Sequence, residues 1–484
     1  MREEIAKLKP QRVWHYFLEI TKVPRPSKKE ERILQYLIDF AKQHDLEYDQ
    51  DETGNLVIRK PAAKGNKSNR IVTLQSHVDM VCEKNEGVDF DFDNDAIEPV
   101  LENGWVKAKD TTLGADDGIG MATELAILEA DDIDHPALEC LFTVDEETGL
   151  TGAFALDKSF LKGDILLNLD SEDDGQLFIG CAGGIDTSVE LPYQKEFAPA
   201  NHAAYRLKIH GLRGGHSGDD IHKGYGNANK LLSRLMWNAA NDYGLRFSSF
   251  DAGSAHNAIA REGAAIITIP QDKAGDFENY VKQMEKTFQN ELHVTEPNVK
   301  VSLEKADMPD HVVDEQAHNN LLNSVYGAAH GVMAWSQDIE NFVETSTNLA
   351  VVSTKEDHFF ILNSHRSSVE SAKEDTKNRV ASVFRLAGAK VSHGDGYPGW
   401  TPNPDSEIVN LTEQSYTDLF KEKPEVLAIH AGLECGLIGE KYPKMDMISY
   451  GPEITGAHSP DEAIEVKSVE KFWDLTLDVL KRIK

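Results

Sequence analysis

Two local patterns alternate over the first 185 residues, and this alternation limits the possible folds more than any other feature of the chain. Apolar residues recur with helical spacing over residues 10–23, 27–44 and 118–130. Short segments that resemble strands, several of them almost continuously apolar, cover residues 55–60, 70–79, 137–147 and 164–170. Apolar strands separated by helices are typical of an α/β sheet with helices on both faces.

The pattern changes in the middle of the chain and returns near its end. Residues 186–399 contain half-exposed strands between long amphipathic helices, which is typical of an α+β domain, and a proline-rich segment follows at 398–405. Residues 400–484 then resume the first pattern. We therefore predict an α/β fold with one split domain, formed by 1–185 and 400–484, whose central mixed sheet is flanked by helices. The inserted α+β domain is long enough for two similar units, although no clean sequence repeat is visible.

Charge and cysteine content exclude several classes of protein. The 82 acidic residues outnumber the 50 basic ones, for a net charge of −32, which argues against general binding to nucleic acid or to anionic membranes. The sequence has neither an apolar run of membrane-spanning length nor a visible secretory signal. Its four cysteines are scattered without a CxxC pair, so we expect a reduced, cytoplasmic protein.

Carboxylates and imidazoles gather at the ends of the predicted strands and in the segments that follow them. In open α/β sheets this edge is where ligands bind. The residues concerned are His77 with Asp79, Asp116 with Asp117, Glu146 with Glu147, Asp170 and His458.

Each of these groups also has an ordinary structural explanation. His77 and Asp79 face the same side of an extended chain, where a carboxylate can orient a metal-binding imidazole, but an isolated pair of this kind is more often structural. Asp116 and Asp117 precede an expected helix at Gly118, so they could cap it, or one carboxylate could bridge two cations.

The remaining candidates are equally ambiguous when taken singly. Glu146 and Glu147 end a strand as neighbours, so one could bind metal while the other faces solvent or substrate; a solvated pair is the usual alternative. Asp170 follows another buried strand. His458 lies in a loop, where a lone histidine is more often a surface residue.

Together these positions supply five nitrogen and oxygen donors. They are His77, Asp116, Glu147, Asp170 and His458. Such donors suit Zn²⁺, Mn²⁺ or Co²⁺, and five ligands with one bridging carboxylate match a pair of metal ions. The sequence therefore predicts a two-metal site.

The ordered motifs HVD, LGADDGIG, DEETG, LD and GAHSPDE resemble those of the M20 metallopeptidases, and most closely those of the bacterial aminoacyl-histidine dipeptidases. The resemblance implies two Zn²⁺ per chain, with Co²⁺ or Mn²⁺ as substitutes. His77 and Asp170 would hold one ion, Glu147 and His458 the other, and Asp116 would bridge them through a segment with a cis peptide to Asp117. Asp79 would orient His77, and Glu146 would be the general base.

The resemblance also implies that the split domain is catalytic and that the inserted domain, 186–399, is a lid. His216 would stabilise the oxyanion, Asn257 would bind substrate, and Arg366 is a candidate for the substrate carboxylate. The loop His430–Gly436 would line the substrate pocket. Without the resemblance, these residues would be taken for loop or surface residues.

The implied activity is hydrolysis of Xaa-His and other unblocked dipeptides by metal-activated water. Another M20-type amidohydrolase, such as a tripeptidase, carboxypeptidase or N-acyl amino acid deacylase, is the alternative, and a non-catalytic metal-binding protein is a third. We expect a small peptide substrate and a homodimer, which would complete the site if His216 lies across the subunit interface. A single chain with two lid-like halves could instead complete its own site, and the sequence leaves both open.

Overall fold

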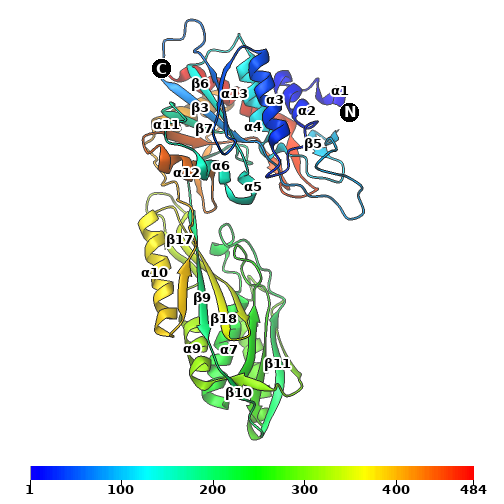
Figure 1. Ribbon diagram of the computed structural model, residues 1–484, viewed down its shortest axis with the longest axis vertical. Coiled ribbons are helices and arrows are strands. Elements are labelled where there is room, and N and C mark those ends of the chain that lie inside the picture. Colours follow the sequence, from blue (N-terminus) through cyan, green and yellow to red (C-terminus); the bar gives the residue numbers. More distant parts are fainter. Residues whose placement is uncertain (1) are drawn as a thin grey trace. The chain divides into compact units, whose positions relative to one another are not determined.

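The computed structural model describes residues 2–484 and divides into two compact units. Unit 1 contains the chain up to Gly180, Trp400–Ala428 and Leu433–Lys484, and unit 2 contains Cys181–Gly399 and Ile429–Gly432. In Figure 1 the blue and red ends of the chain both belong to unit 1, and green to yellow segments form unit 2. The N-terminal and C-terminal parts of the chain thus fold into one unit.

Unit 1 is built on a mixed sheet of eight strands, in the order β1-β2-β6-β3-β7-β21-β8-β20. Strands β6, β3, β7 and β21 are parallel, whereas β1, β2 and β6 pair in antiparallel fashion. Almost every side chain of β3 and β7 is buried, as expected for strands covered on both faces. The bounds are β1 Glu47–Gln50, β2 Leu56–Lys60, β3 Ile71–His77, β6 Ala137–Thr143, β7 Ile165–Asn168, β8 Gln176–Cys181, β20 Glu425–Ile429 and β21 Asp446–Ser449.

Helices and a small second sheet complete unit 1. Helix α2 packs on α4, which lies against β3, and α11 packs on both α13 and β21. The helices are α1 Arg2–Ile5, α2 Gln11–Ile20, α3 Glu31–Gln43, α4 Ala115–Glu129, α5 Glu146–Gly149, α6 Thr151–Ala155, α11 Glu407–Phe420, α12 Glu434–Lys441 and α13 Val466–Arg482. The small sheet contains β4 Pro99–Glu102, β5 Trp105–Ala108, β22 Ile454–Thr455 and β23 Ala463–Glu465.

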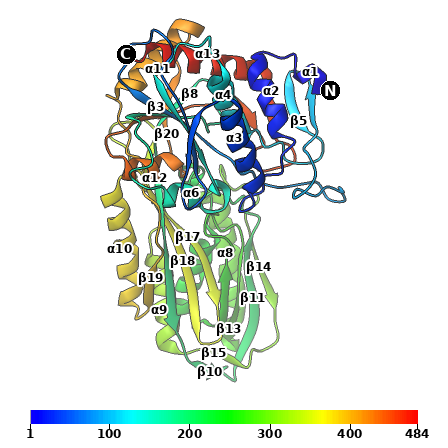
Figure 2. The ribbon, with the colours of Figure 1, turned by 45° about the horizontal axis from the view of Figure 1, so that its top comes forward.

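Unit 2 contains a nine-stranded sheet, seen with its strands side by side in Figure 2. Its main order is β14-β11-β13-β12-β17-β18-β9-β19, with β16 paired to β17. The strands are β9 Gly183–Pro192, β11 His202–His210, β12 Arg246–Ala252, β13 Gly263–Pro270, β14 Lys300–Lys305, β16 Gly331–Trp335, β17 Val343–Thr354, β18 His358–Ser367 and β19 Lys390–His393. A separate pair joins β10 Lys195–Phe197 and β15 His311–Val313.

The sheet of unit 2 consists of two similar halves. One half runs β11, α7 Ala228–Tyr243, β12, β13, α8 Ala274–Glu291, β14; the other runs β9, α9 Glu315–Gly327, β17, β18, α10 Glu370–Leu386, β19. Each half is therefore a β-α-β-β-α-β motif, and the halves meet where Ala252 of β12 pairs with Val352 of β17. The structure shows two α+β halves, with the first nested inside the second.

Side chains from all four helices bury against one face of this sheet. Leu232 of α7, Phe277 of α8, Leu321 of α9 and Phe384 of α10 belong to one core cluster with strand residues such as Phe359. Alternating strand residues point to this core, which agrees with the predicted α+β character. The predicted α/β class with an additional α+β domain is confirmed.

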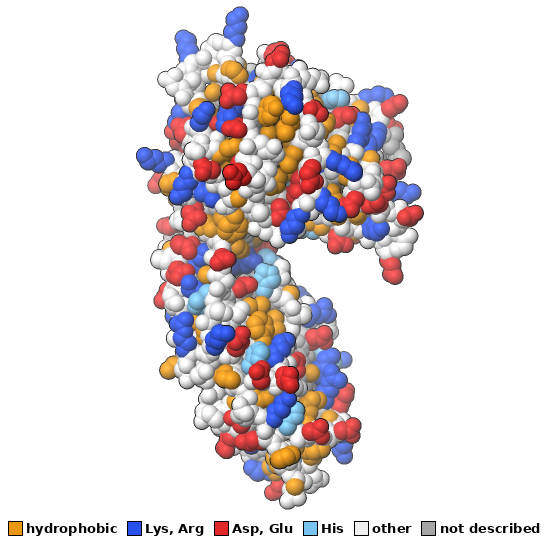
Figure 3. Space-filling view, viewed as in Figure 1, with side chains coloured by type: hydrophobic (Ala, Val, Ile, Leu, Met, Phe, Trp, Pro, Cys, Tyr) orange, Lys and Arg blue, Asp and Glu red, His pale blue; other side chains and the backbone are white. Residues whose placement is uncertain are grey.

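The surface is rich in charge. On the face shown in Figure 3, acidic and basic side chains are interspersed over both units. Among residues 2–484, no helix has the length and apolar character needed to cross a membrane.

Candidate metal centre

The predicted ligands of unit 1 come together at the carboxyl ends of its parallel strands. His77 is the last residue of β3, Asp170 follows β7 by two residues, and Glu147 lies in α5, just after β6. Asp116 lies in the first turn of α4, and His458 lies in the loop between β22 and β23. Neighbouring strands thus deliver side chains that are far apart in the sequence.

The Asp116 carboxylate lies between two imidazoles. Its Oδ1 is 2.9 Å from Nε2 of His77, and its Oδ2 is 3.1 Å from Nε2 of His458. The peptide bond between Asp116 and Asp117 is cis, and both residues have non-helical dihedral angles inside α4. One carboxylate therefore presents a separate oxygen to each of two groups of ligands.

Each imidazole also faces a second carboxylate. Nε2 of His77 is 3.4 Å from Oδ1 of Asp170, and Nε2 of His458 is 3.0 Å from Oε2 of Glu147. The ligand atoms of His77, Asp116 and Asp170 all lie within 4.8 Å of one another, and so do those of Asp116, Glu147 and His458. These are two three-residue groups that share Asp116.

The chemistry of this cluster fits a pair of divalent cations. All five side chains offer nitrogen or oxygen, and Oε1 of Glu147 is buried with no hydrogen-bond partner among residues 2–484. A buried carboxylate oxygen without a partner is costly, and a cation would satisfy it. The donor set suits Zn²⁺, Mn²⁺ or Co²⁺.

In the absence of metal, the closely packed carboxylates determine whether the imidazoles of the cluster are protonated. Burial lowers the pKa of His77, but nearby Asp170 and Asp116 outweigh it and raise that pKa well above its usual value. Hydrogen bonds to Asp116 and Glu147 raise the pKa of His458 to about 11. Protons on the imidazoles thus balance the carboxylates, and cations would take their place on binding, because ligand imidazoles must be neutral.

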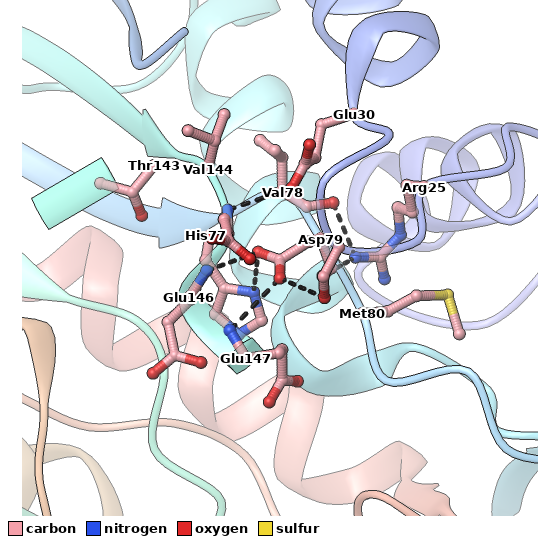
Figure 4. A network of polar contacts seen from close by, with 12 residues as sticks. Arg25, Glu30, His77, Val78, Asp79, Met80, Thr143, Val144, Glu146 and Glu147 are labelled. Atoms are coloured by element: carbon pink, nitrogen blue, oxygen red, sulfur yellow. Dashed lines mark hydrogen bonds and ion pairs between the residues drawn. The ribbon is translucent and has the colours of Figure 1, made fainter. Parts of the chain in front are cut away.

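Asp79 connects the imidazole of His77 to the start of α5. Its Oδ1 lies 3.4 Å from Nδ1 of His77 and accepts the backbone N–H of Glu146 at 3.0 Å, while Oδ2 accepts the N–H of Glu147 and the hydroxyl of Ser27. Figure 4 shows the Asp79 carboxylate between the His77 ring and this backbone. Despite burial, which raises it, the pKa of Asp79 falls to about 2 because of the His77 hydrogen bond and these donors.

The two glutamates differ from the expectation that they end a strand. Strand β6 stops at Thr143, and Glu146 begins the short helix α5 after Asp145, which has a left-handed backbone at φ 51°. Their carboxylates nevertheless point in different directions in Figure 4, as predicted. Burial raises the pKa of Glu146 well above its usual value even though His77 lowers it, so this carboxyl holds a proton more readily than a solvated one.

Several buried polar residues around the cluster were not identified from the sequence. Glu434 accepts hydrogen bonds from Gln75 and Thr143, each at 2.6 Å, and Asn168 donates to Gln75 at 2.6 Å. This polar row crosses β6, β3 and β7 just before the ligand-bearing ends. Two further charged residues, Arg25 and Glu462, hold the backbone near Asp116. Two of them lie in motifs that the sequence shows: Glu434 in the glycine-rich loop His430–Gly436, and Glu462 at the end of GAHSPDE.

In unit 2, the structure brings the segments of His216 and Asn257 together. Ala258 forms an isolated bridge with His216, and the N–H of Ser217 donates to the Asn257 carbonyl at 2.8 Å. Nδ1 of His216 lies 3.1 Å from Oδ2 of Asp219, which lowers the pKa of Asp219. The side chain of His216 is one-third exposed, and Asn257 is exposed.

Arg366 lies in a second polar group of unit 2. It belongs to β18 opposite Ser346 of β17, and its Nη1 donates to the hydroxyl of Tyr397 at 3.0 Å. Ser346 contacts Nε2 of His430 at 2.7 Å. Arg366 is only 8% exposed, and its Nε has no hydrogen-bond partner in the described part of the chain. Arg366 therefore has hydrogen-bonding capacity to spare.

Comparison with known proteins shows which family the chain belongs to. Residues 73–482 match the model of peptidase family M20/M25/M40. The chain is 40% identical over 480 residues to the cytosol non-specific dipeptidase of Escherichia coli strain K12, covering 99% of both chains.

Two solved protein structures are also similar to this chain. The aminoacylhistidine dipeptidase of Vibrio alginolyticus is 40% identical, with a TM-score of 0.93 over 99% of this chain and 98% of that one. A tripeptidase from Staphylococcus aureus, 16% identical with a TM-score of 0.58 over 98% and 99% of the two chains, shares the fold. The chain belongs to peptidase family M20/M25/M40.

Proposed function

We propose that this chain is a metal-dependent dipeptidase that hydrolyses Xaa-His and other unblocked dipeptides. The observation that carries the proposal is the Asp116 carboxylate, which offers one oxygen beside His77 and the other beside His458. The substrate class is supported by relatives that are named cytosol non-specific dipeptidase and aminoacylhistidine dipeptidase, both 40% identical along almost the whole chain. The first of these names also supports a cytosolic location.

The metal assignment follows the two ligand groups. His77 and Asp170 would hold one ion, Glu147 and His458 the other, and Asp116 would bridge them; we propose Zn²⁺, with Co²⁺ or Mn²⁺ as substitutes. When bound, such ions act as Lewis acids and lower the pKa of a bound water molecule to near neutral.

Side chains of this protein would transfer the proton and position the metal ligands. Glu146 would accept a proton from the attacking water and return it to the leaving amine, a role that suits a buried carboxyl with a raised pKa. Asp79 would hold His77 in one orientation and fix the backbone of Glu146.

Unit 2 would supply the groups that recognise substrate, acting as a lid. His216 would donate to the developing oxyanion, Asn257 would bind the peptide, and Arg366 would pair with the C-terminal carboxylate. The buried guanidinium of Arg366, with Nε unpaired, supports this last role.

Metal analysis combined with turnover tests the proposal. The purified chain is assayed with Xaa-His dipeptides, other dipeptides, tripeptides and N-acyl amino acids, before and after chelation. We expect two ions per chain, preferential dipeptide cleavage, loss of cleavage on chelation and recovery with Zn²⁺. Turnover that survives complete metal removal would contradict the mechanism, and preference for tripeptides or acyl amino acids would contradict the substrate class.

Single-ligand variants test the assignment of the two groups. His458→Ala and Asp170→Ala should each lower metal content, because each removes one donor from a different group. Elemental analysis that finds full occupancy in both variants would overturn the ligand set.

A homodimer is part of the proposal, and mixed subunits test how it works. Chains that carry Glu146→Gln are combined with chains that carry His216→Ala, and each variant is inactive or nearly so alone. Activity that recovers on mixing indicates that His216 serves a partner's site, whereas no recovery in verified mixed dimers indicates that each chain completes its own.

A further inference from the structure

The turn that leads into Asp116 is held by a buried carboxylate. Glu462 is 2% exposed, and its two oxygens accept four consecutive backbone N–H groups. Oε2 accepts from Leu113 at 2.7 Å and Gly114 at 2.9 Å, and Oε1 accepts from Ala115 at 2.7 Å and Asp116 at 3.3 Å. These groups open α4 and have no partners within the helix, so Glu462 satisfies them and also suits the positive end of the helix dipole.

The buried guanidinium of Arg25 also binds this turn, through a carbonyl group rather than through N–H groups. Arg25 is 3% exposed, and its Nη2 donates to the carbonyl of Gly114 at 2.5 Å. Its Nη1 donates to the carbonyls of Val78, at 2.9 Å, and Asp79. Figure 4 shows the guanidinium directed at this Val78–Asp79 backbone. Gly114 is thus bound through its N–H by Glu462 and through its carbonyl by Arg25.

Two glycines leave the space that the guanidinium occupies. A Cβ at Gly114 would lie 2.6 Å from Nη2 of Arg25, and a Cβ at Gly118 would lie 2.8 Å from the same atom. Gly114 also has φ +70°, which other residues rarely adopt. The LGADDGIG segment is therefore shaped around Arg25.

Both charged residues connect segments that carry predicted ligands. Arg25 binds the backbone immediately after His77, and Glu462 lies four residues after His458 in the same loop. Each of them also binds the turn that carries Asp116.

We propose that Arg25 and Glu462 are positioning residues for the metal centre. They fix the backbone of three segments at the spacing that metal binding needs: the segments that carry His77, Asp116 and His458. Two buried charges are an expensive way to stabilise a fold, since apolar residues of similar volume often do so as well or better. Groups that orient metal ligands typically change metal affinity about 10- to 100-fold when removed. The inference rests on the proposed metal site.

Cobalt binding by the metal-free full chain tests this role without using peptide turnover. Glu462→Gln keeps the shape of the side chain but turns an NH₂ group toward backbone donors. Arg25→Lys keeps the charge but lacks the fork that reaches Gly114 and Val78 together. For each variant that is folded by circular dichroism, we expect Co²⁺ affinity to fall at least about 10-fold, with a changed visible absorption spectrum.

Glu139→Gln is the matched control. Glu139 is 1% exposed, accepts the N–H groups of Lys162 and Gly163 and pairs with Arg59, but it lies near the start of β6, away from the ligand-bearing ends. It should lower thermal stability without changing Co²⁺ affinity or spectrum.

Three results would overturn the inference. They are wild-type affinity and spectrum in a folded Glu462→Gln or Arg25→Lys chain, an equal loss of affinity in Glu139→Gln, and a wild-type chain that binds no Co²⁺. A wild-type chain that binds two Co²⁺ ions but cleaves no dipeptide would refute the proposed function while leaving this test valid.

Discussion

Glu146 and its neighbour Glu147 show how one residue position separates two roles. The carboxylate of Glu147 lies 3.0 Å from Nε2 of His458, whereas Glu146 points elsewhere and contributes its backbone N–H to Asp79. We therefore predict that Glu146→Gln keeps both metal ions and lowers kcat about 10²- to 10⁴-fold, because an amide cannot accept the proton. Parallel elemental analysis and steady-state kinetics measure the two effects.

Glu147→Gln is the matched comparison for this prediction. It changes the adjacent residue in the same helix, α5, in the same way, but it should lower metal content. Near-normal turnover of Glu146→Gln would remove this residue from the role of base, and loss of metal from that variant would place it among the ligands instead.

The unused hydrogen-bonding capacity of Arg366 leads to a second prediction about a single residue. Its buried guanidinium donates to Tyr397 and has Nε unpaired in the described chain, so a carboxylate can still bind to it. Arg366→Ala should raise KM for free dipeptides about 10- to 100-fold, as expected for loss of a hydrogen bond to a charged group. The KM for the corresponding dipeptide amides should change much less.

Arg385→Ala is the control for Arg366, because Arg385 is an exposed arginine at the end of α10. Its kinetics with both kinds of substrate should match the wild type. An equal rise in KM for dipeptides and amides in Arg366→Ala would contradict carboxylate recognition.

At the scale of elements, a polar row joins the strands that carry the site. Glu434, at the start of α12, accepts from Gln75 of β3 and Thr143 of β6. Glu434→Ala would leave these buried donors short of an acceptor, so we predict a loss of about 2–4 kcal/mol in the free energy of unfolding. Urea unfolding measures this change.

Glu434→Gln separates the hydrogen bonds from the carboxyl group. It retains an oxygen that can accept from the same partners, so it should recover most of the stability lost in Glu434→Ala. If the alanine variant unfolds at the wild-type urea concentration, the row does not tie the strands together.

Local patterns in the sequence were sufficient for the strands and their polar ends. His77 and Asp170 follow apolar runs that are buried, as β3 and β7 show, and the parallel pairing of those strands brings them together. The role of Glu462 could not be predicted, because it binds backbone N–H groups of a segment far away in the sequence. The short helix at Glu146 depends on the left-handed backbone of Asp145, which composition does not reveal.

In the molecule as a whole, the repeat of unit 2 cannot be recognised in the sequence, because one half is inserted within the other. The first half, β11 to β14, is inserted between β9 and α9 of the second, so corresponding strands are not separated by a constant interval. Only the strand order, which mirrors itself about the β12–β17 junction, reveals the similarity.

Unit 2 also contains several buried or half-buried histidines that desolvation keeps neutral. Burial lowers the pKa of His365 and His430 to about 3, and that of His318 and His330 to about 4. An unfolded histidine titrates near 6.5. Between that pH and the folded pKa, the unfolded chain binds protons that the folded chain does not, so acid favours unfolding.

His365 makes this effect testable, because both of its ring nitrogens are engaged inside the sheet. Nε2 contacts Thr187 Oγ1 at 2.9 Å and Nδ1 contacts Thr347 Oγ1 at 2.8 Å. As pH falls from 6 to 4.5, each such histidine should remove up to about 1.4 kcal/mol of stability per pH unit. His365→Gln, which cannot titrate, should lessen the slope for unit 2 by that amount, measured by hydrogen exchange of β17 and β18 in urea.

Ser367→Ala, in the same strand, distinguishes titration from simple destabilisation. It removes the buried contact between Ser367 Oγ and Thr345 Oγ1, at 2.9 Å, but no titratable group. Its stability should therefore be lower at every pH, with the wild-type slope. If His365→Gln also keeps the wild-type slope, proton uptake by this histidine on unfolding does not contribute to acid sensitivity, and the source must lie in other groups of unit 2.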